Sequence, residues 1–128
     1  MADNNSTGKI ISKETADQDF GRPTFSVLMS SEQLQGFASK TTNLLMFNFI
    51  DERLIILGDD RNLLYPEGAH IPPESVFKVY SKEKVLELME AGGEDDNFVE
   101  IRTDNVTITN GDFTLEFGTF CPPWCSSV

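Results

Sequence analysis

Residues 25–38, FSVLMSSEQLQGFA, decide the fold class of this chain, because they pass from strand to helix within a few positions. Every second residue from 25 to 29 is a large apolar one, which is the period of a β-strand with one buried face. Ser30 and its neighbour are favoured N-terminal caps of a helix. Leu34, Phe37 and Ala38 then recur at spacings of three and four residues, as on the buried face of a helix. The stretch predicts a strand followed directly by a short helix over 30–40.

The order of elements repeats along the chain. Strands are predicted at 44–50, 54–57 and 63–65, and the pattern then restarts with a strand at 76–80, a helix at 81–91 and strands at 98–102, 106–109 and 113–117. Ser30 matches Ser81 at a separation of 51 residues, and later positions such as Phe47 and Val99 match at 52. We therefore interpret 25–65 and 76–117 as two βαβββ-like halves of one α+β domain with antiparallel sheet and two short helices.

Residues 1–23 are polar and lack periodicity, so they are predicted to form a flexible N-terminal arm, with a short edge strand at 9–12 as its one regular element. The remainder, 24–128, has the length of a single domain. The apolar faces of the predicted strands and helices define its core, namely Phe25, Val27, Leu34, Phe37, Leu45, Phe47, Phe49, Leu54, Ile56, Val85, Leu88, Val99, Ile101, Val106, Ile108, Leu115 and Phe117.

The chain is strongly acidic, with 10 Lys and Arg against 21 Asp and Glu, a formal net charge of −11. Tight binding to nucleic acid or to an anionic membrane needs clustered Lys and Arg, so both are disfavoured. The excess is uneven, because residues 59–128 hold 5 basic and 14 acidic residues, a net charge of −9. The densest acidic cluster follows the middle of the second predicted helix and comprises Glu87, Glu90, Glu94, Asp95 and Asp96.

This cluster has two interpretations. Acidic residues near a helix C-terminus oppose the helix dipole at a cost of about 0.3–1 kcal/mol each, which suggests that they serve a purpose. One interpretation is a solvated face that aids solubility, and the other is a surface for a basic partner protein. The large apolar face of Trp124 near the C-terminus is either a plug packed on the sheet or a second anchor for that partner.

No constellation of catalytic or metal-binding residues stands out. His70 is the single imidazole and no nucleophile motif accompanies it. Cys121 and Cys125 are spaced CxxxC rather than CxxC, and two thiolates are half of a zinc shell. The pairs Asp59-Asp60 and Asp95-Asp96 lack the spacing of a calcium loop and are typical of turns. We expect no cofactor, no bound metal and no enzymatic activity.

These observations predict a non-catalytic acidic module that binds or masks a basic partner protein, as inhibitors and immunity proteins do. The first residues lack the apolar stretch of a signal peptide, and no stretch reaches the length of a membrane span. We therefore expect a cytoplasmic protein without direct nucleic-acid or membrane contacts.

The order of elements in 25–65 and 76–117 resembles that of DNA sliding clamps, in which two βαβββ units form one domain. The resemblance implies, as an alternative function, a processivity subunit that assembles into a ring around DNA with its helices lining the hole. Clamp helices that face DNA are rich in Lys and Arg. The segment 30–40 here has a net charge of 0, with Lys40 against Glu32, and 81–91 has a net charge of −1, with two lysines against three glutamates.

Overall fold

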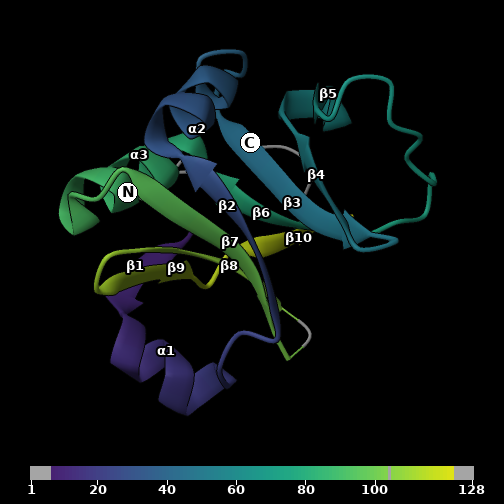
Figure 1. The fold of residues 1–128 in the computed structure, drawn as a ribbon. Coiled ribbons are helices and arrows are strands. Elements are labelled where there is room, and N and C mark those ends of the chain that lie inside the picture. The colour runs from purple at the N-terminus through teal and green to yellow at the C-terminus, as the bar shows by residue number, and fades with distance from the viewer. Residues whose placement is uncertain (1–6, 104, 123–128) are drawn as a thin grey trace, which may run out of the picture.

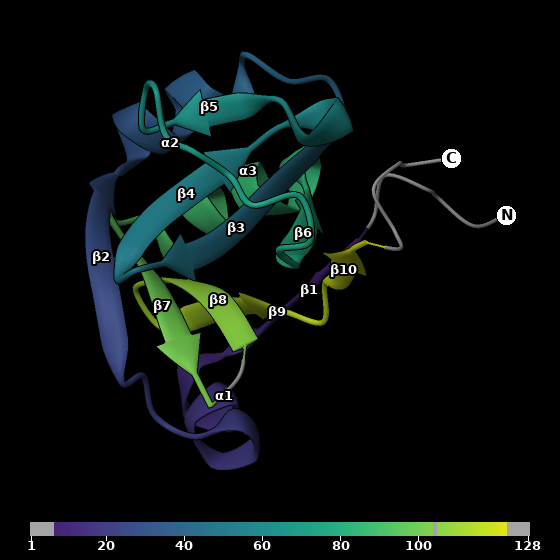
Figure 2. The same cartoon turned by 90° about the vertical axis from the view of Figure 1, so that its right-hand side faces the viewer.

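The described residues form two antiparallel sheets, three α-helices and one short 3-10 helix, Asp59–Arg61. Figures 1 and 2 show their arrangement from two sides. This computed structural model describes residues 7–103 and 105–122. The predicted α+β class with antiparallel sheet is confirmed. The helices are α1 Lys13–Phe20, α2 Ser31–Ala38 and α3 Lys82–Gly92, and the strands are β1 Lys9–Ser12, β2 Phe25–Ser30, β3 Leu44–Ile50, β4 Arg53–Leu57, β5 Leu63–Tyr65, β6 Phe77–Ser81, β7 Asp96–Arg102, β8 Asn105–Asn110, β9 Phe113–Glu116 and β10 Thr119–Cys121.

Each half of the chain contributes strands to both sheets. Sheet A has the order β1-β9-β8-β7-β2, and sheet B has the order β10-β6-β3-β4-β5. The strand that precedes α2 therefore lies beside β7 from the second half, and the strand that precedes α3 lies beside β3 from the first. This exchange ties the halves together through long-range pairing, so neither half forms a sheet of its own.

The strands of the two sheets pair in equivalent registers. Val27 lies opposite Val99 in sheet A, and Lys78 lies opposite Phe47 in sheet B. These are the partners expected from the separations of 51 and 52 residues. The five β3–β4 pairs likewise correspond to the five β7–β8 pairs at a separation of 52. The correspondence ends at β5, where the β4–β5 register shifts.

Helices α2 and α3 pack their predicted faces into a common interior between the sheets. Ser30 caps α2 in a reciprocal arrangement, because its hydroxyl accepts a hydrogen bond from the Gln33 backbone and the Gln33 side chain accepts one from the Ser30 backbone. The main apolar cluster has these fully or largely buried members: Met29, Leu34, Ala38, Leu45, Phe47, Leu54, Ile56, Tyr80, Val85, Leu88, Met89, Val99, Val106, Ile108 and Leu115. A second cluster covers the outer face of sheet B.

Two predicted core residues are exposed, and four others, Val27, Phe37, Phe49 and Ile101, are only partly buried. Phe117 is 53% exposed, and its backbone φ of 63° takes it out of the alternation of the last strand, so its ring packs edge-on against Phe20 instead. Phe25 is 39% exposed at the start of edge strand β2, where its ring meets Phe49. Alternation alone identified the inward side of these strands but not where the strands end.

The N-terminal segment differs most from expectation. Within 1–23, the expected strand at 9–12 is present and pairs with β9, but residues 13–20 form helix α1 instead of a flexible arm. The backbone of Thr7 also bonds Ser81 of sheet B, so this segment touches both sheets. Sequence periodicity missed α1 because Ala16 is its single buried residue. The described part of the chain thus has three α-helices, where the sequence predicted two.

The helices of the described residues are short. The longest, α3, has 11 residues, and none is long and apolar enough to cross a membrane.

Candidate interaction surface

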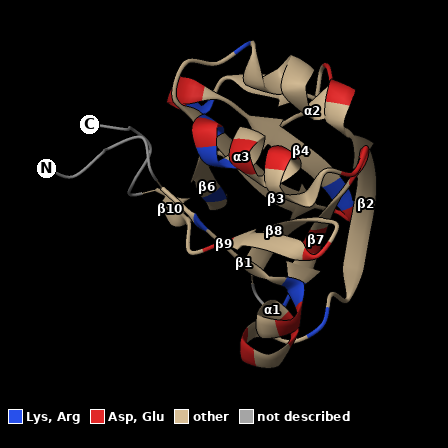
Figure 3. Ribbon diagram, turned by 90° about the vertical axis from the view of Figure 1, so that its left-hand side faces the viewer, with Lys and Arg blue, Asp and Glu red and all other residues tan. Residues whose placement is uncertain are grey.

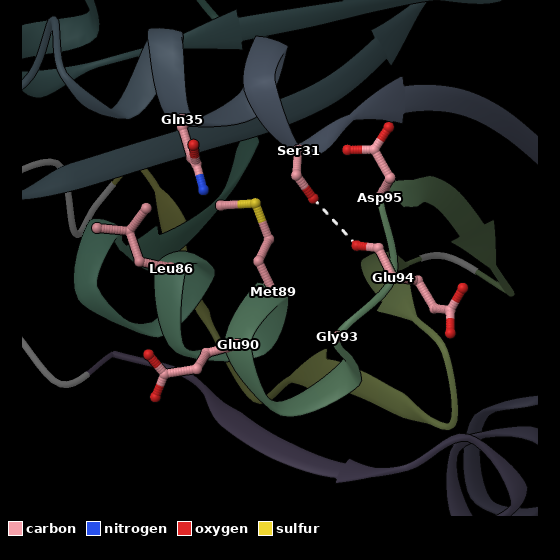
Figure 4. A pocket seen from close by; sticks show the side chains of 8 residues that line it. All are labelled: Ser31, Gln35, Leu86, Met89, Glu90, Gly93, Glu94 and Asp95. Atoms are coloured by element: carbon pink, nitrogen blue, oxygen red, sulfur yellow. Dashed lines mark hydrogen bonds between the residues drawn. The ribbon is translucent and has the colours of Figure 1, made fainter.

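A groove lies between α2 and α3, at the end of the fold where the two helices pack side by side. Its apolar part is formed by Leu86, which is 36% exposed, and by the mostly buried Met89. Figure 4 shows the Met89 side chain reaching from α3 toward α2. The groove has a volume of about 540 Å³, which is room for side chains of a partner, and its lining is Ser31, Gln35, Leu86, Met89, Glu90, Gly93, Glu94 and Asp95.

Three of the predicted acidic residues border this groove. The carboxylates of Glu90, Glu94 and Asp95 project outward in different directions around the apolar residues, as Figure 4 shows. Figure 3 shows that acidic residues also mark the exposed side of α3 and the start of α2. Because the three carboxylates diverge, they create a negative rim rather than a compact chelating cluster.

Two glycines at the end of α3 set the direction of the acidic loop, which is the segment that carries Glu94 and Asp95. Gly93 adopts the left-handed conformation, with φ 71°, and its N–H donates to the Met89 carbonyl at 3.0 Å, which ends the helix. Gly92 passes so close to Asn110 that a Cβ at this position would overlap the Asn110 side-chain amide. The Gly-Gly pair therefore turns the chain sharply and places Glu94 and Asp95 at the groove.

Buried amides then fix this loop to the rest of the fold. The Asn110 side chain accepts a hydrogen bond from the Glu94 N–H at 3.0 Å and donates one to the Glu94 carbonyl at 2.9 Å. It also donates to Asn97 at 2.9 Å, and Asn97 in turn donates to the Ser31 hydroxyl at 3.1 Å. The start of α2 and the acidic loop are thus held by one network. The sequence analysis did not predict this role for either Asn97 or Asn110.

Two other predicted partner-binding residues, Glu87 and Asp96, do not line the groove. Glu87 is on α3 and pairs with Lys84 at 3.5 Å on the surface. Asp96 begins β7, where it lies opposite Ser30 of β2. Trp124 lies outside the described residues, as does Cys125. The assignment of all six residues to partner binding stays a prediction.

The remaining candidates for chemistry are not brought together. His70 lies in a separate cleft beside Asp51 and Arg53, which shares no lining residue with the α2–α3 groove. The Asp59 carboxylate accepts the backbone N–H groups of residues 42–44, with the Leu44 N–H at 2.9 Å, so it fixes the segment before β3 instead of capping its own turn. Within residues 7–103 and 105–122, no group of three or more His, Cys, Asp and Glu side chains is placed to hold a metal ion.

Sequence reasoning also missed a buried ionic network on the outer face of sheet A. Arg102, fully buried, donates to Glu100 at 3.0 Å and to Asp17 of α1 at 2.5 Å. The hydroxyls of Thr107 and Thr109 donate to the same Glu100 carboxylate. The hydrogen bond from Arg102 holds the pKa of Asp17 below its usual value. This network docks α1 and lies apart from the groove.

A second buried ion pair joins the two sheets. Lys78 of β6 donates to Glu116 at the end of β9 at 2.6 Å and to Asn105 at 3.1 Å. The neighbouring Tyr80 hydroxyl donates to the Val106 carbonyl at 2.7 Å. Burial of the Tyr80 phenol, reinforced by the negative charge of Glu116, raises the pKa of Tyr80 well above its usual value. These groups are closed off within the fold, so they serve its architecture.

Comparisons with known proteins give this chain no relative. No family model, no curated protein and no solved structure matches it.

Proposed function

We propose that the chain is a non-catalytic acidic interaction module that binds a basic partner protein at the α2–α3 groove and masks the partner's basic surface. The observation that carries the proposal is the placement of Glu90, Glu94 and Asp95 around an open apolar floor formed by Leu86 and Met89. Interfaces of this kind combine a desolvated apolar centre with a charged rim that selects the partner and speeds association.

The geometry of the groove suits Lys and Arg side chains in particular. Their aliphatic stems can pack on Leu86 and Met89 while the charged heads reach the surrounding carboxylates. The loop that carries Glu94 is held by Asn110 in the free protein, so little ordering is needed on binding. A rigid rim of diverging carboxylates favours a partner with several spaced basic residues over a single cation.

A charge-reversal comparison tests the location of the site. One variant carries Glu90→Lys, Glu94→Lys and Asp95→Lys, and a matched control reverses three exposed acids elsewhere, Asp19, Glu52 and Glu67. Both variants change the net charge equally. Proteins captured from cell extract by the wild-type chain are identified by mass spectrometry and compared between the two variants.

We expect basic proteins to be captured by the wild type and by the control but lost by the groove variant. Equal loss in both variants would show a non-specific charge effect and contradict the proposed site. Capture that persists unchanged from low to high salt would also contradict the electrostatic part, because exposed charges are screened within about 10 Å at 0.1 M salt.

A second candidate, a sliding-clamp-like subunit that forms a ring around DNA, is favoured by one observation. The orders β2-α2-β3-β4-β5 and β6-α3-β7-β8-β9 are the same, and the strand registers correspond as far as β4 and β8. Light scattering at micromolar concentration tests it, since a ring built from such a chain needs several copies. A monomer or dimer contradicts this candidate and leaves the interaction module unaffected.

A further inference from the structure

Edge strand β2 differs from the other edge strands of the two sheets, which are β1, β5 and β10. β5 and β10 have three residues each, and the four-residue β1 begins with Lys9. Short length and lysine are devices by which proteins prevent an edge from pairing with another chain. Among the described strands, β2 is the edge without them, because its six residues, FSVLMS, are uncharged. Figures 2 and 3 show β2 at the margin of the molecule, with none of the described helices or strands beyond it.

The backbone groups at this edge can be assigned from the β2–β7 ladder. The Ser31 N–H donates to the Asp95 carbonyl at 2.8 Å, in continuation of the β2–β7 register. Alternate residues of an antiparallel strand direct both backbone groups to the same neighbour, so Met29 and Val27 face β7. Ser26 and Leu28 therefore direct their N–H and C=O groups to the open edge.

Exposed apolar side chains accompany these open backbone groups. Leu28 is 56% exposed, and its direct cross-strand neighbour Phe98 is 40% exposed. Both project from the outer face of sheet A, next to the edge. A strand that offers hydrogen-bonding groups beside an apolar patch has the properties of a surface that accepts another strand.

We propose that β2 pairs antiparallel with β2 of a second copy of this chain, about a two-fold axis at Val27. The open groups of Ser26 and Leu28 lie symmetrically on either side of Val27. With the axis at this residue, Ser26 of each copy lies opposite Leu28 of the other. Every N–H and C=O of the two residues then has a partner, and the two copies of sheet A join into one continuous sheet.

The charges at the two ends of β2 favour a second copy as the occupant. Arg22 precedes the strand, Glu32 follows it, and Asp96 lies opposite its last residue, Ser30. Antiparallel pairing brings the Arg22 end of each copy to the Glu32 and Asp96 end of the other. β2 itself is uncharged. The acidic residues that would repel a second copy therefore lie outside the paired strands.

Analytical ultracentrifugation of the full chain tests this contact. We expect a reversible dimer to form as the concentration rises from about 1 to about 200 μM at about 0.15 M NaCl, where more distant charges are screened. Leu28→Lys should weaken dimerisation at least about tenfold, because it places a charge on the open edge. Phe113→Lys is the matched control, since Phe113 is 37% exposed on β9 of the same sheet, and it should leave the dimer intact.

Cysteine cross-linking tests the position of the axis. At the axis the two Val27 residues form a pair without direct hydrogen bonds, with Cα atoms about 4.5 Å apart, which suits a disulfide. Under mild oxidation Val27→Cys should give a covalent dimer. Ser26→Cys should give none beyond the wild-type background, because its counterpart lies two residues further along the partner strand.

A chain that stays monomeric over the whole concentration range would overturn the proposal. So would a dimer that Leu28→Lys leaves as stable as the wild type, because the contact would then lie elsewhere. Cross-linking through Ser26→Cys but not Val27→Cys would overturn the two-fold axis at Val27. Circular dichroism of each variant separates loss of the contact from loss of the fold.

Discussion

The outer faces of the two sheets have opposite chemistry although their strands correspond in register. On sheet B the outer face is apolar, with Met46, Leu57 and Phe77 among its buried residues, and it is covered by Ile71 and its neighbours. On sheet A the outer face carries a buried ionic network centred on Arg102 and Glu100, and α1 covers part of it. One framework of strands thus supports two different ways of covering a sheet.

Different interactions hold the covering segments on the two outer faces. Apolar packing on sheet B is non-directional, and its contribution grows with the area removed from water. The network on sheet A is directional, because Arg102 must meet Asp17 and Glu100 at once to dock α1. Removing one partner of a buried pair leaves a charge without compensation, whereas removing a methylene group leaves a small cavity. The two faces should therefore respond differently to substitution and to pH.

The largest effect is expected from Arg102→Met on sheet A. It leaves the Glu100 carboxylate buried without its ion pair and releases Asp17, so the free energy of unfolding should fall by about 3–5 kcal/mol. Urea denaturation followed by circular dichroism measures the change. Adding Glu100→Leu to this variant removes the unpaired buried charge and should restore part of the lost free energy of unfolding. A loss below about 1 kcal/mol from Arg102→Met, the range of exposed pairs such as Lys84–Glu87, would contradict a buried network.

On sheet B the corresponding test is Met46→Ala, in the middle of the apolar outer face. Met46 is fully buried, so the truncation should lower the free energy of unfolding by about 2–5 kcal/mol, and by less than Arg102→Met if the cavity partly collapses. The same urea titration measures it. Val76→Ala is the control, because Val76 is 47% exposed and its truncation should cost little. A similar loss from both variants would mean that the outer face of sheet B is not a packed layer.

The alternation of apolar residues predicted most of this framework. It located the strands of both halves and their inward residues, because a strand with one buried face has an apolar residue at every second position. It also marked the outer face of β8 as polar, since Thr107 and Thr109 alternate with Val106 and Ile108. Alternation does not indicate whether such a polar face is covered by another element of the fold. The helix α1 that covers it buries Ala16 alone and is held by a salt bridge to a residue 85 positions away.

The candidate groove was predictable in part. The acidic residues Glu90, Glu94 and Asp95 were identified from charge density, but density does not distinguish them from Glu87, which turns to Lys84 instead. That distinction depends on helix phase and on the turn at Gly93. The hydrogen bond between the buried amides of Asn97 and Asn110 could not be predicted from the sequence. The periodicity of a strand shows which residues are apolar, but it does not show which polar side chains contact one another.

The smallest effect, and the one that separates the two faces by pH, is expected from Asp17→Asn. Because the pKa of Asp17 is lower in the folded protein than in the unfolded chain, its charge stabilises the fold above the unfolded pKa, and this contribution is lost as pH falls through the folded pKa. The variant should therefore be less stable than the wild type near neutral pH and should approach it in acid. Urea midpoints measured between about pH 2 and pH 7 give the comparison. Asp19→Asn, at an exposed position of the same helix, should leave the pH dependence close to that of the wild type. A constant difference between Asp17→Asn and wild type across the whole range would show that α1 is held by packing and not by the Arg102 ion pair.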